Sequence, residues 1–190
     1  MNNVDLSIIL FTVIISLSGL IINYLKRGNK SQVLFSDDGN TLLFFRLGIP
    51  ISLFVSVAIY FIDIGFFVSF LGIKSLGYLM IISGLLIRWL AVYQLGNAFQ
   101  VSVSIINNQQ LIDHGLYSKI RHPSYTGLLL YYLGLGLLMQ NFLCIILLSL
   151  VPLLIVLLRI KKEEAVLNAY FKEEYALYIS KTKKLIPFIF

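Results

Sequence analysis

The chain has 190 residues, of which 58 % are hydrophobic, and a formal charge of +6. A mean hydropathy of +0.89 excludes a soluble domain. The charge is not a nucleic-acid footprint, because the basic residues lie at the ends of apolar runs, where anionic lipid attracts them. One cysteine, Cys144, and two isolated histidines argue against disulfides and a metal site. We expect a single integral membrane domain over residues 1–190, without metal or nucleic acid.

Three apolar runs in the first half are each long enough to cross a bilayer, which takes about 20 residues. They cover residues 6–25, 42–62 and 76–95. Pro50 is expected to kink the second run, because proline cannot donate a helical hydrogen bond. Residues 1–95 are therefore predicted to form three N-terminal spans.

The second half holds one long apolar run, residues 125–158, between a polar segment at 96–123 and a charged tail. As one helix this run would be roughly 50 Å long, which exceeds a bilayer. Gln140 and Asn141 divide it into two short spans, 125–139 and 142–158. We predict an all-α polytopic membrane protein with about five transmembrane helices, the last two a short hairpin, plus a cytoplasmic loop and a C-terminal amphipathic helix.

The lysines and arginines are distributed asymmetrically around these spans. Three follow the first span (Lys26, Arg27 and Lys30), two lie at 96–123 and seven lie from residue 159 onward, whereas Lys74 stands on the opposite side. The positive-inside rule then places the N-terminus outside and the C-terminus in the cytoplasm. The expected location is a prokaryotic cell membrane.

The most informative stretch is Arg121-His122-Pro123-Ser124-Tyr125-Thr126-Gly127, directly before an apolar run. Proline is favoured in the first helical turn, so a helix should begin here. A helix N-terminus presents free backbone N–H groups that can hold an anion. The alternative interpretation is a basic interface anchor in front of an ordinary helix start.

A second pattern lies where the last span meets the tail. Arg159, Glu163, Leu167 and Phe171 follow at four-residue spacing. If the span continues into the tail as one helix, they form a stripe on one face. Ionisable groups at the membrane boundary usually face protein or a water-filled cavity, which indicates a site. A surface Arg–Glu pair on an interfacial helix is the alternative.

These residues together resemble the isoprenylcysteine carboxyl methyltransferase family. The match covers about half the chain, from Leu95 to the C-terminus, and the first three spans agree only in hydropathy. It rests on Leu95-Gly96-x-x-Phe99, on Gly115-x-Tyr117-x-x-x-Arg121-His122-Pro123-x-Tyr125-x-Gly127, on Arg159 with Glu163-Glu164, and on Phe171, Tyr175, Tyr178 and Pro187.

The resemblance implies an integral membrane enzyme that transfers a methyl group from S-adenosylmethionine, with S-adenosylhomocysteine as product. Residues 96–190 would be its catalytic half, with the cofactor at the cytoplasmic face and a lipophilic acceptor, an isoprenylcysteine-like carboxylate, entering from the bilayer. Arg159 matches the arginine assigned to that carboxylate, and Arg121 is a second candidate. Positions matching the family's cofactor contacts are Gln109, Gln110, Leu111, Ile112, Tyr117, His122, Pro123, Ser124, Tyr125 and Glu163.

One departure from the family concerns its C-terminal arginine, which is replaced here by Lys183 or Lys184. Lysine keeps the positive charge but cannot form the two parallel hydrogen bonds that an arginine makes with a carboxylate. Alternative acceptors are a phospholipid amine or a small thiol. Other classes are a sterol-reductase-like NADPH enzyme and a non-catalytic membrane scaffold. Arg88 is expected either to face the bundle or to line the acceptor tunnel, and Arg46 to be an interfacial anchor.

Overall fold

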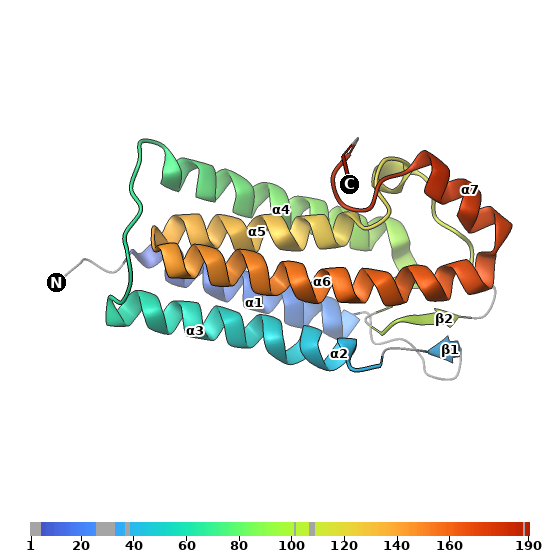
Figure 1. Ribbon diagram of the computed structural model, residues 1–190, viewed down its shortest axis with the longest axis horizontal. Helices are drawn as coiled ribbons and strands as arrows, with labels where there is room; N and C mark the ends of the chain where they lie inside the picture. The colour runs from blue at the N-terminus through green and yellow to red at the C-terminus, as the bar shows by residue number, and fades with distance from the viewer. Residues whose placement is uncertain (1–4, 26–32, 37–38, 101, 107–108, 188) are drawn as a thin grey trace.

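The computed structural model describes residues 5–25, 33–36, 39–100, 102–106, 109–187 and 189–190. Its long helices run side by side along one axis, and the shorter elements gather at one end (Figure 1). Lys26, Arg27 and Lys30 lie outside the described residues. The elements are α1 (Leu6–Leu25), β1 (Val33–Ser36), α2 (Thr41–Leu43), η2 (Phe44–Gly48), α3 (Ile49–Ile62), α4 (Ile73–Leu95), η3 (Gly96–Ala98), β2 (Ser104–Ile106), η4 (Gly115–Ser118), α5 (Pro123–Met139), α6 (Phe142–Phe171) and α7 (Glu173–Lys181).

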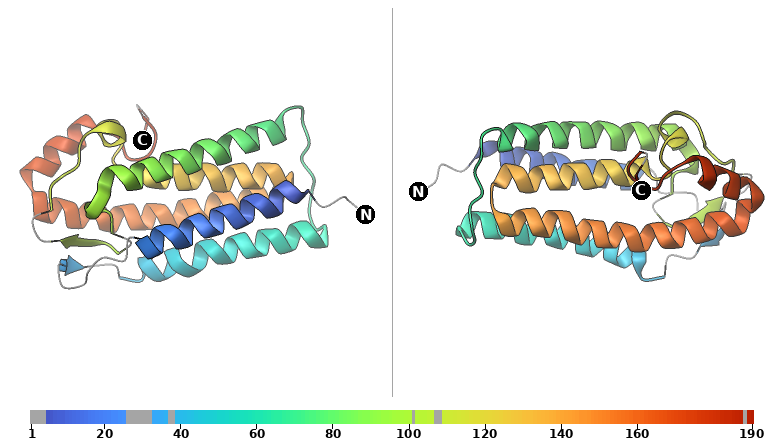
Figure 2. Two further views of the ribbon diagram at one scale, coloured as in Figure 1. Left: turned by 180° about the vertical axis from the view of Figure 1, so that it is seen from behind. Right: turned by 45° about the horizontal axis from the view of Figure 1, so that its top comes forward.

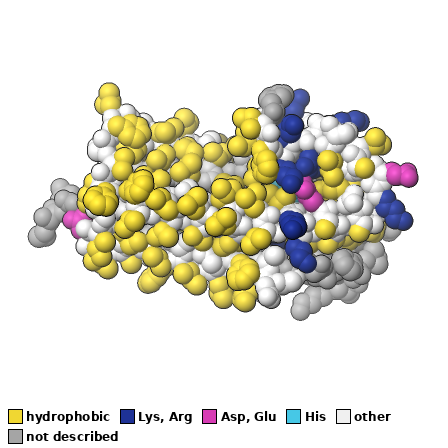
Figure 3. All heavy atoms as spheres, viewed as in Figure 1, with side chains coloured by type: hydrophobic (Ala, Val, Ile, Leu, Met, Phe, Trp, Pro, Cys, Tyr) yellow, Lys and Arg dark blue, Asp and Glu magenta, His cyan; other side chains and the backbone are white. Residues whose placement is uncertain are grey.

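The helical membrane fold predicted from hydropathy is confirmed. Among the described residues, four helices are long and apolar enough to cross a membrane: Leu6–Leu25, Thr41–Ile62, Ile73–Leu95 and Phe142–Phe171. The fifth, α5, has 17 residues, or about 26 Å, slightly less than the hydrocarbon thickness. Hydrophobic side chains cover the body formed by the long helices. Lys and Arg gather towards the end that carries the shorter elements (Figure 3). The chain is therefore an integral membrane protein.

The predicted hairpin of the last two spans is present, and Asn141 closes it. Gln140 adopts a left-handed φ of 53°, and the Asn141 side chain accepts from the N–H groups of Leu143 (3.0 Å) and Cys144 (3.2 Å). Two otherwise unpaired donors of the α6 N-terminus are thereby satisfied. The helix then runs for 30 residues, about 45 Å, so residues 142–158 cross the bilayer and the remainder projects beyond it.

The irregularity expected at Pro50 falls one turn earlier, as the π-helical turn η2. Pro50 lies in the first turn of α3. Its missing N–H and its ring disturb the hydrogen bonding of the preceding turn, and a π-turn accommodates this without breaking the span.

Glycines bring α4 and α5 into backbone contact. A Cβ on Gly84 would lie 2.7 Å from the carbonyl oxygen of Gly127, and one on Gly134 would lie 2.7 Å from that of Gly77. In lipid, helices associate by such close packing of small residues, because the bilayer supplies no hydrophobic drive between them. This contact fixes the start of α5 against α4.

A two-stranded antiparallel ribbon, which the sequence did not predict, joins β1 to β2. Val103 and Ile105 are buried against Val166 and Leu167 of α6. The ribbon therefore holds part of the polar loop against the projecting end of α6.

The C-terminal tail returns to the turn before α5 (Figure 2). Ile120 and Lys183 form a parallel bridge. The N–H of Arg121 donates to the carbonyl of Lys183 at 2.7 Å, and that of His122 donates to Lys184 at 3.0 Å. The two segments that carry the sequence motif thus lie side by side.

Glu164 is the charged centre of this contact. Its Oε1 lies 2.8 Å from Arg121 Nε and 3.3 Å from His122 Nε2, and its Oε2 lies 3.6 Å from Lys184 Nζ. Arg121 Nη1 also donates to the carbonyl of Thr182 at 2.6 Å. Burial opposes ionisation of Glu164, but the hydrogen bonds from His122 and Arg121 outweigh it and lower its pKa to about 2.

Gly84→Ala should destabilise the bundle, because its methyl group would lie 2.7 Å from backbone atoms of Gly127 and Tyr131. We expect the free energy of unfolding to fall by about 1–3 kcal/mol, measured as a lower Tm in detergent. Gly19→Ala is the matched control: outside its own helix backbone, its methyl group meets none of the described atoms within 4 Å, so Tm should hold or rise. Equal Tm values for the two variants would contradict the packing argument.

Glu164→Gln should lower Tm at neutral pH by removing the anionic partner of Arg121. The folded-state pKa of Glu164 lies below its usual 4.5, so its stabilisation is complete above about pH 4.5 and is lost as pH falls towards 2. The Tm gap between wild type and variant should therefore narrow from about pH 5 to about pH 3. Glu174→Gln, at an exposed position, is the control, and a gap that stays constant with pH would refute this role.

Candidate active site

One cavity of about 400 Å³ lies where the bundle meets the loop and tail. Its walls come from α1, η2, α3, α4, residues 98–100 and 109–112, η4, the turn before α5, and α5, α6 and α7. Pro123, also predicted for the site, begins α5 without lining the cavity. The other site residues predicted from the sequence all line it: Gln109, Gln110, Leu111, Ile112, Tyr117, Arg121, His122, Ser124, Tyr125, Arg159 and Glu163.

The stripe predicted on α6 lies on the cavity wall. Arg159, Glu163, Leu167 and Phe171 all line the cavity, because α6 continues past the membrane boundary as one helix. Arg159 thus stands at the boundary and Glu163 one turn beyond it.

Tyr125 connects the arginine and the carboxylate of this stripe. Arg159 Nε donates to Tyr125 Oη at 2.9 Å, and this hydroxyl donates to Glu163 Oε2 at 2.9 Å. The Arg159 guanidinium also lies 5.2 Å from the centroid of the Phe45 ring. A phenol between the two charges keeps them apart within one hydrogen-bonded unit, so each can serve a different group of a ligand.

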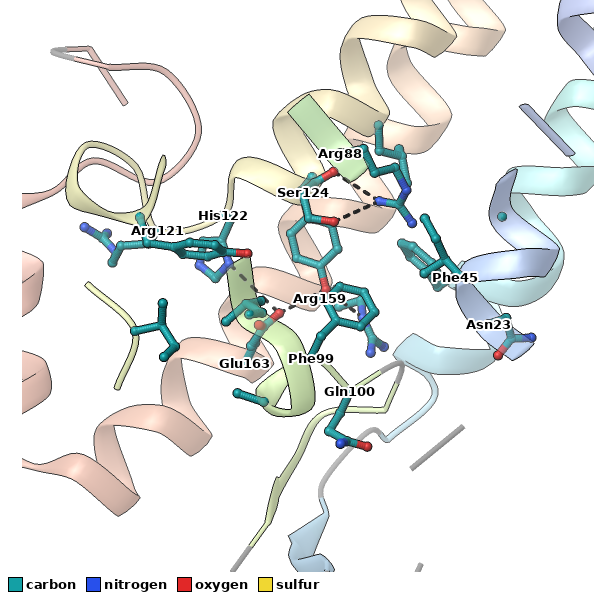
Figure 4. A pocket seen from close by; sticks show the side chains of 18 of the residues that line it. Asn23, Phe45, Arg88, Phe99, Gln100, Arg121, His122, Ser124, Arg159 and Glu163 are labelled. Carbon is teal, nitrogen blue, oxygen red and sulfur yellow. Dashed lines mark hydrogen bonds and ion pairs between the residues drawn. The ribbon is translucent and has the colours of Figure 1, made fainter. Parts of the chain in front are cut away.

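Arg88 lies on the α4 side of the same cavity and holds the first turn of α5 (Figure 4). It is 5 % exposed, and its Nη1 donates to Ser124 at the carbonyl oxygen (3.1 Å) and at Oγ (3.2 Å). Its Nε is buried without a hydrogen-bond partner among the described residues. Arg88 was expected either to face the bundle or to line a tunnel. The structure shows that it does both: it contacts α5 and lies on the cavity wall.

Tyr175 on α7 carries a second unsatisfied donor. Its side chain lines the cavity and is 1 % exposed, yet within the described ranges its hydroxyl has no partner. Burial first, and then the negative charges of Glu164 and Glu163, raise the pKa of Tyr175, so the phenol stays protonated. Buried polar groups are rarely left unpaired, and an orphan hydroxyl on a cavity wall is a place where a ligand atom fits.

Arg121 is placed differently from Arg159. It lines the cavity, but Nε and Nη1 are directed to Glu164 and Thr182. This geometry favours a positioning task for Arg121 over direct contact with a reacting group.

The cavity also has walls that the sequence did not indicate. Asn23, Gly19 and Ile15 of α1 and Ile49 of α3 line it, as does Arg46, which was expected only as an interfacial anchor. The available signal was polarity: an amide and a guanidinium within apolar spans are expensive and usually functional. No hydropathy pattern distinguishes the other three.

Comparison with known proteins agrees with this architecture. The family model described as isoprenylcysteine carboxyl methyltransferase matches residues 76–169. A probable protein-S-isoprenylcysteine O-methyltransferase of Oryza sativa subsp. indica is 34 % identical over 125 residues, covering 65 % of this chain and 63 % of the relative. The protein-S-isoprenylcysteine O-methyltransferase of Schizosaccharomyces pombe is 35 % identical over 128 residues, covering 66 % and 53 %.

A solved structure shows the same likeness in three dimensions. The eukaryotic intramembrane Ras methyltransferase ICMT superposes with a TM-score of 0.64 at 27 % identity, over 74 % of this chain and 52 % of the other. The chain thus spans less than two thirds of the rice relative and about half of the fission yeast relative and of the solved enzyme. The region matched by the family model carries α4, α5 and most of α6, the helices that hold Arg88, Tyr125, Arg159 and Glu163, and the chain belongs to the isoprenylcysteine carboxyl methyltransferase family.

Proposed function

We propose that this protein transfers a methyl group from S-adenosylmethionine to the carboxylate of an isoprenylcysteine-like acceptor. The observation that carries the proposal is one continuous cavity with two chemically different ends. Its loop and tail side carries Glu163, Tyr175 and Gln109, and its membrane side is walled by apolar residues of α1 and α3 such as Ile15 and Ile49. A polar, charged donor and a lipid-tailed acceptor need such a division.

The residues present fit the methyl donor. The Glu163 carboxylate suits an ammonium or ribose hydroxyls, and the orphan hydroxyl of Tyr175 can donate to a buried acceptor atom. The first turn of α5 lacks a side-chain cap at His122. Its Tyr125 and Thr126 N–H groups donate to the carbonyl of His122, so the partial positive charge of the helix N-terminus, not a set of free N–H groups, would favour a carboxylate here. When bound, S-adenosylmethionine supplies an electrophilic methyl group on a sulfonium.

The acceptor side requires orientation more than acid–base chemistry. A carboxylate is ionised at neutral pH, so no general base is needed. Its oxygen bonds to the methyl carbon while the carbon–sulfur bond breaks and the electron pair stays on sulfur. Arg159 holds the acceptor carboxylate beside Tyr125, and the enclosure aligns the groups and excludes water. Arg121, predicted as a second catalytic candidate, acts here as a positioning residue.

The active site in this proposal faces the cytoplasm. Exposed Lys172, Lys181 and Lys183 lie on the projecting end of the molecule together with Lys161, as the positive-inside rule requires, and the N-terminus lies outside. The whole chain acts as one membrane domain. The rice and fission yeast relatives are eukaryotic, and a prokaryotic source for this chain stays a prediction.

The alternative acceptors and the sterol-reductase alternative are not favoured, because the relatives' names specify isoprenylcysteine methyl transfer. Three measurements on detergent-purified protein test the proposal: calorimetric titration with S-adenosylhomocysteine, titration with NADPH, and radiolabelled methyl transfer onto farnesylcysteine analogues and total lipid extract. Binding of NADPH but not of S-adenosylhomocysteine would overturn it. Labelling of lipid amines or small thiols alone would change the acceptor.

Glu163→Gln should weaken S-adenosylhomocysteine binding by about ten- to a hundredfold, the range expected when a hydrogen bond to a charged group is lost. Calorimetry measures this directly. Glu173→Gln, at an exposed position of α7, should bind as the wild type does. Unchanged affinity in Glu163→Gln removes this carboxylate from the donor site.

Arg159→Met should reduce methyl transfer to farnesylcysteine by at least about a hundredfold, because the acceptor carboxylate loses its buried cationic partner. S-adenosylhomocysteine affinity should stay within about threefold of wild type. Arg159→Lys should restore part of the rate, since lysine keeps the positive charge but cannot bind the carboxylate through two parallel N–H groups. Lys161→Met, an exposed position on the same helix, is the control, and a normal rate in Arg159→Met would refute the assignment.

A further inference from the structure

Gly19 stands on the cavity wall in the middle of α1. It follows Ile15 by four residues and precedes Ile22 by three, so all three share one helix face. Ile15 and Ile22 are each 2 % exposed, whereas a Cβ on Gly19 would lie within 4 Å of no described atom beyond its own stretch of helix backbone. Gly19 is itself exposed and lines the cavity, so the space beside it is continuous with the cavity.

No packing contact with the described part of the chain requires a glycine at this position. Glycine in a helix interior is destabilising relative to alanine. In α4 and α5, Gly84 and Gly127 are required because the two backbones touch, but Gly19 has no such neighbour within the described ranges. Among the described residues, no side chain fills the room beside Gly19, so a lipid or the tail of a ligand can occupy it.

The opposite wall of this room is a row from η2 and α3. Phe45, Ile49 and Leu53 are spaced by four residues and all line the cavity. Helices α1 and α3 run side by side (Figure 2). Phe45 also touches the Arg159 guanidinium, so the row begins at the polar end of the site and continues into the membrane body.

We propose that Gly19 is a specificity-determining residue that leaves room for the isoprenoid tail of the acceptor between α1 and α3. This inference rests on the proposed function. With a rise of 1.5 Å per residue, Asn23, Gly19 and Ile15 are spaced by about 6 Å along α1, so the first isoprene units lie near Asn23 and later ones near Gly19 and Ile15. Side chains added along this row then set how long a tail the enzyme accepts.

The test compares acceptors that share one head group, N-acetylcysteine, and carry geranyl, farnesyl or geranylgeranyl tails. In Gly19→Leu, kcat/KM for the farnesyl and geranylgeranyl acceptors should fall by about tenfold or more, with little change for the geranyl acceptor. Ser16→Leu, one turn further from the polar end on the cavity wall, should penalise the geranylgeranyl acceptor most. S-adenosylhomocysteine affinity should be unchanged in both variants, which also shows that they are folded.

Leu17→Trp is the matched control, because Leu17 of the same helix is 50 % exposed and is not part of the cavity wall. It should treat the three acceptors as wild type does. The inference is wrong, while the proposed function stands, if Gly19→Leu and Ser16→Leu bind S-adenosylhomocysteine and their kcat/KM values for the three acceptors equal those of wild type. The same holds if kcat/KM falls by the same factor for all three tail lengths. If wild type methylates none of the three acceptors, the proposed function fails, and the inference fails with it.

Discussion

The contact between Arg121 and Glu164 holds together two segments that are 43 residues apart in the sequence. Their side chains are only 6 % and 16 % exposed, so removing either partner would leave a charge without its counter-ion in a poorly solvated place. The backbone pairing of the turn before α5 with the tail depends on the same closure. If the two segments separated, the cavity would lose the wall between the start of α5 and α7.

The second structural constraint is the continuity of α6. One uninterrupted helix fixes Arg159 at the membrane boundary and Glu163 one turn beyond it, so their separation along the bilayer normal is set by helix geometry. The helix ends where Lys172 takes a left-handed φ of 49°. This reversal turns α7 back over the site and places Tyr175 and Tyr178 on the cavity wall.

Features encoded locally could be read from the sequence. The spans follow from length and hydropathy, the start of α5 from Pro123, and the α6 stripe from its four-residue period. Distant pairings could not be read: strands of three and four residues give no signal of their partner, and only the fold brings them together.

The α1 and α3 walls were missed for a different reason. A membrane helix is apolar on the faces that meet lipid and on those that meet protein, so Ile49 facing a cavity looks like Ile49 facing lipid. Gly19 carries no signal until the space around it is known. Arg88 could be noticed as a charge within a span, but its hold on Ser124 required the packing of α4 against α5.

The charges on the cavity wall favour the proposed carboxylate acceptor over a neutral one. Of the described residues that line the cavity, Glu163 is the acidic one, against Arg46, Arg88, Arg121 and Arg159, and Arg121 is already paired with Glu164. In a medium of low dielectric, this excess of positive charge raises the energy of any cation that is not paired with an anion. A sulfonium donor would therefore be held less well beside an amine or a thiol than beside a carboxylate. An anionic acceptor between the arginines and the sulfonium would attract both and reduce the net positive charge, so each ligand would strengthen the binding of the other.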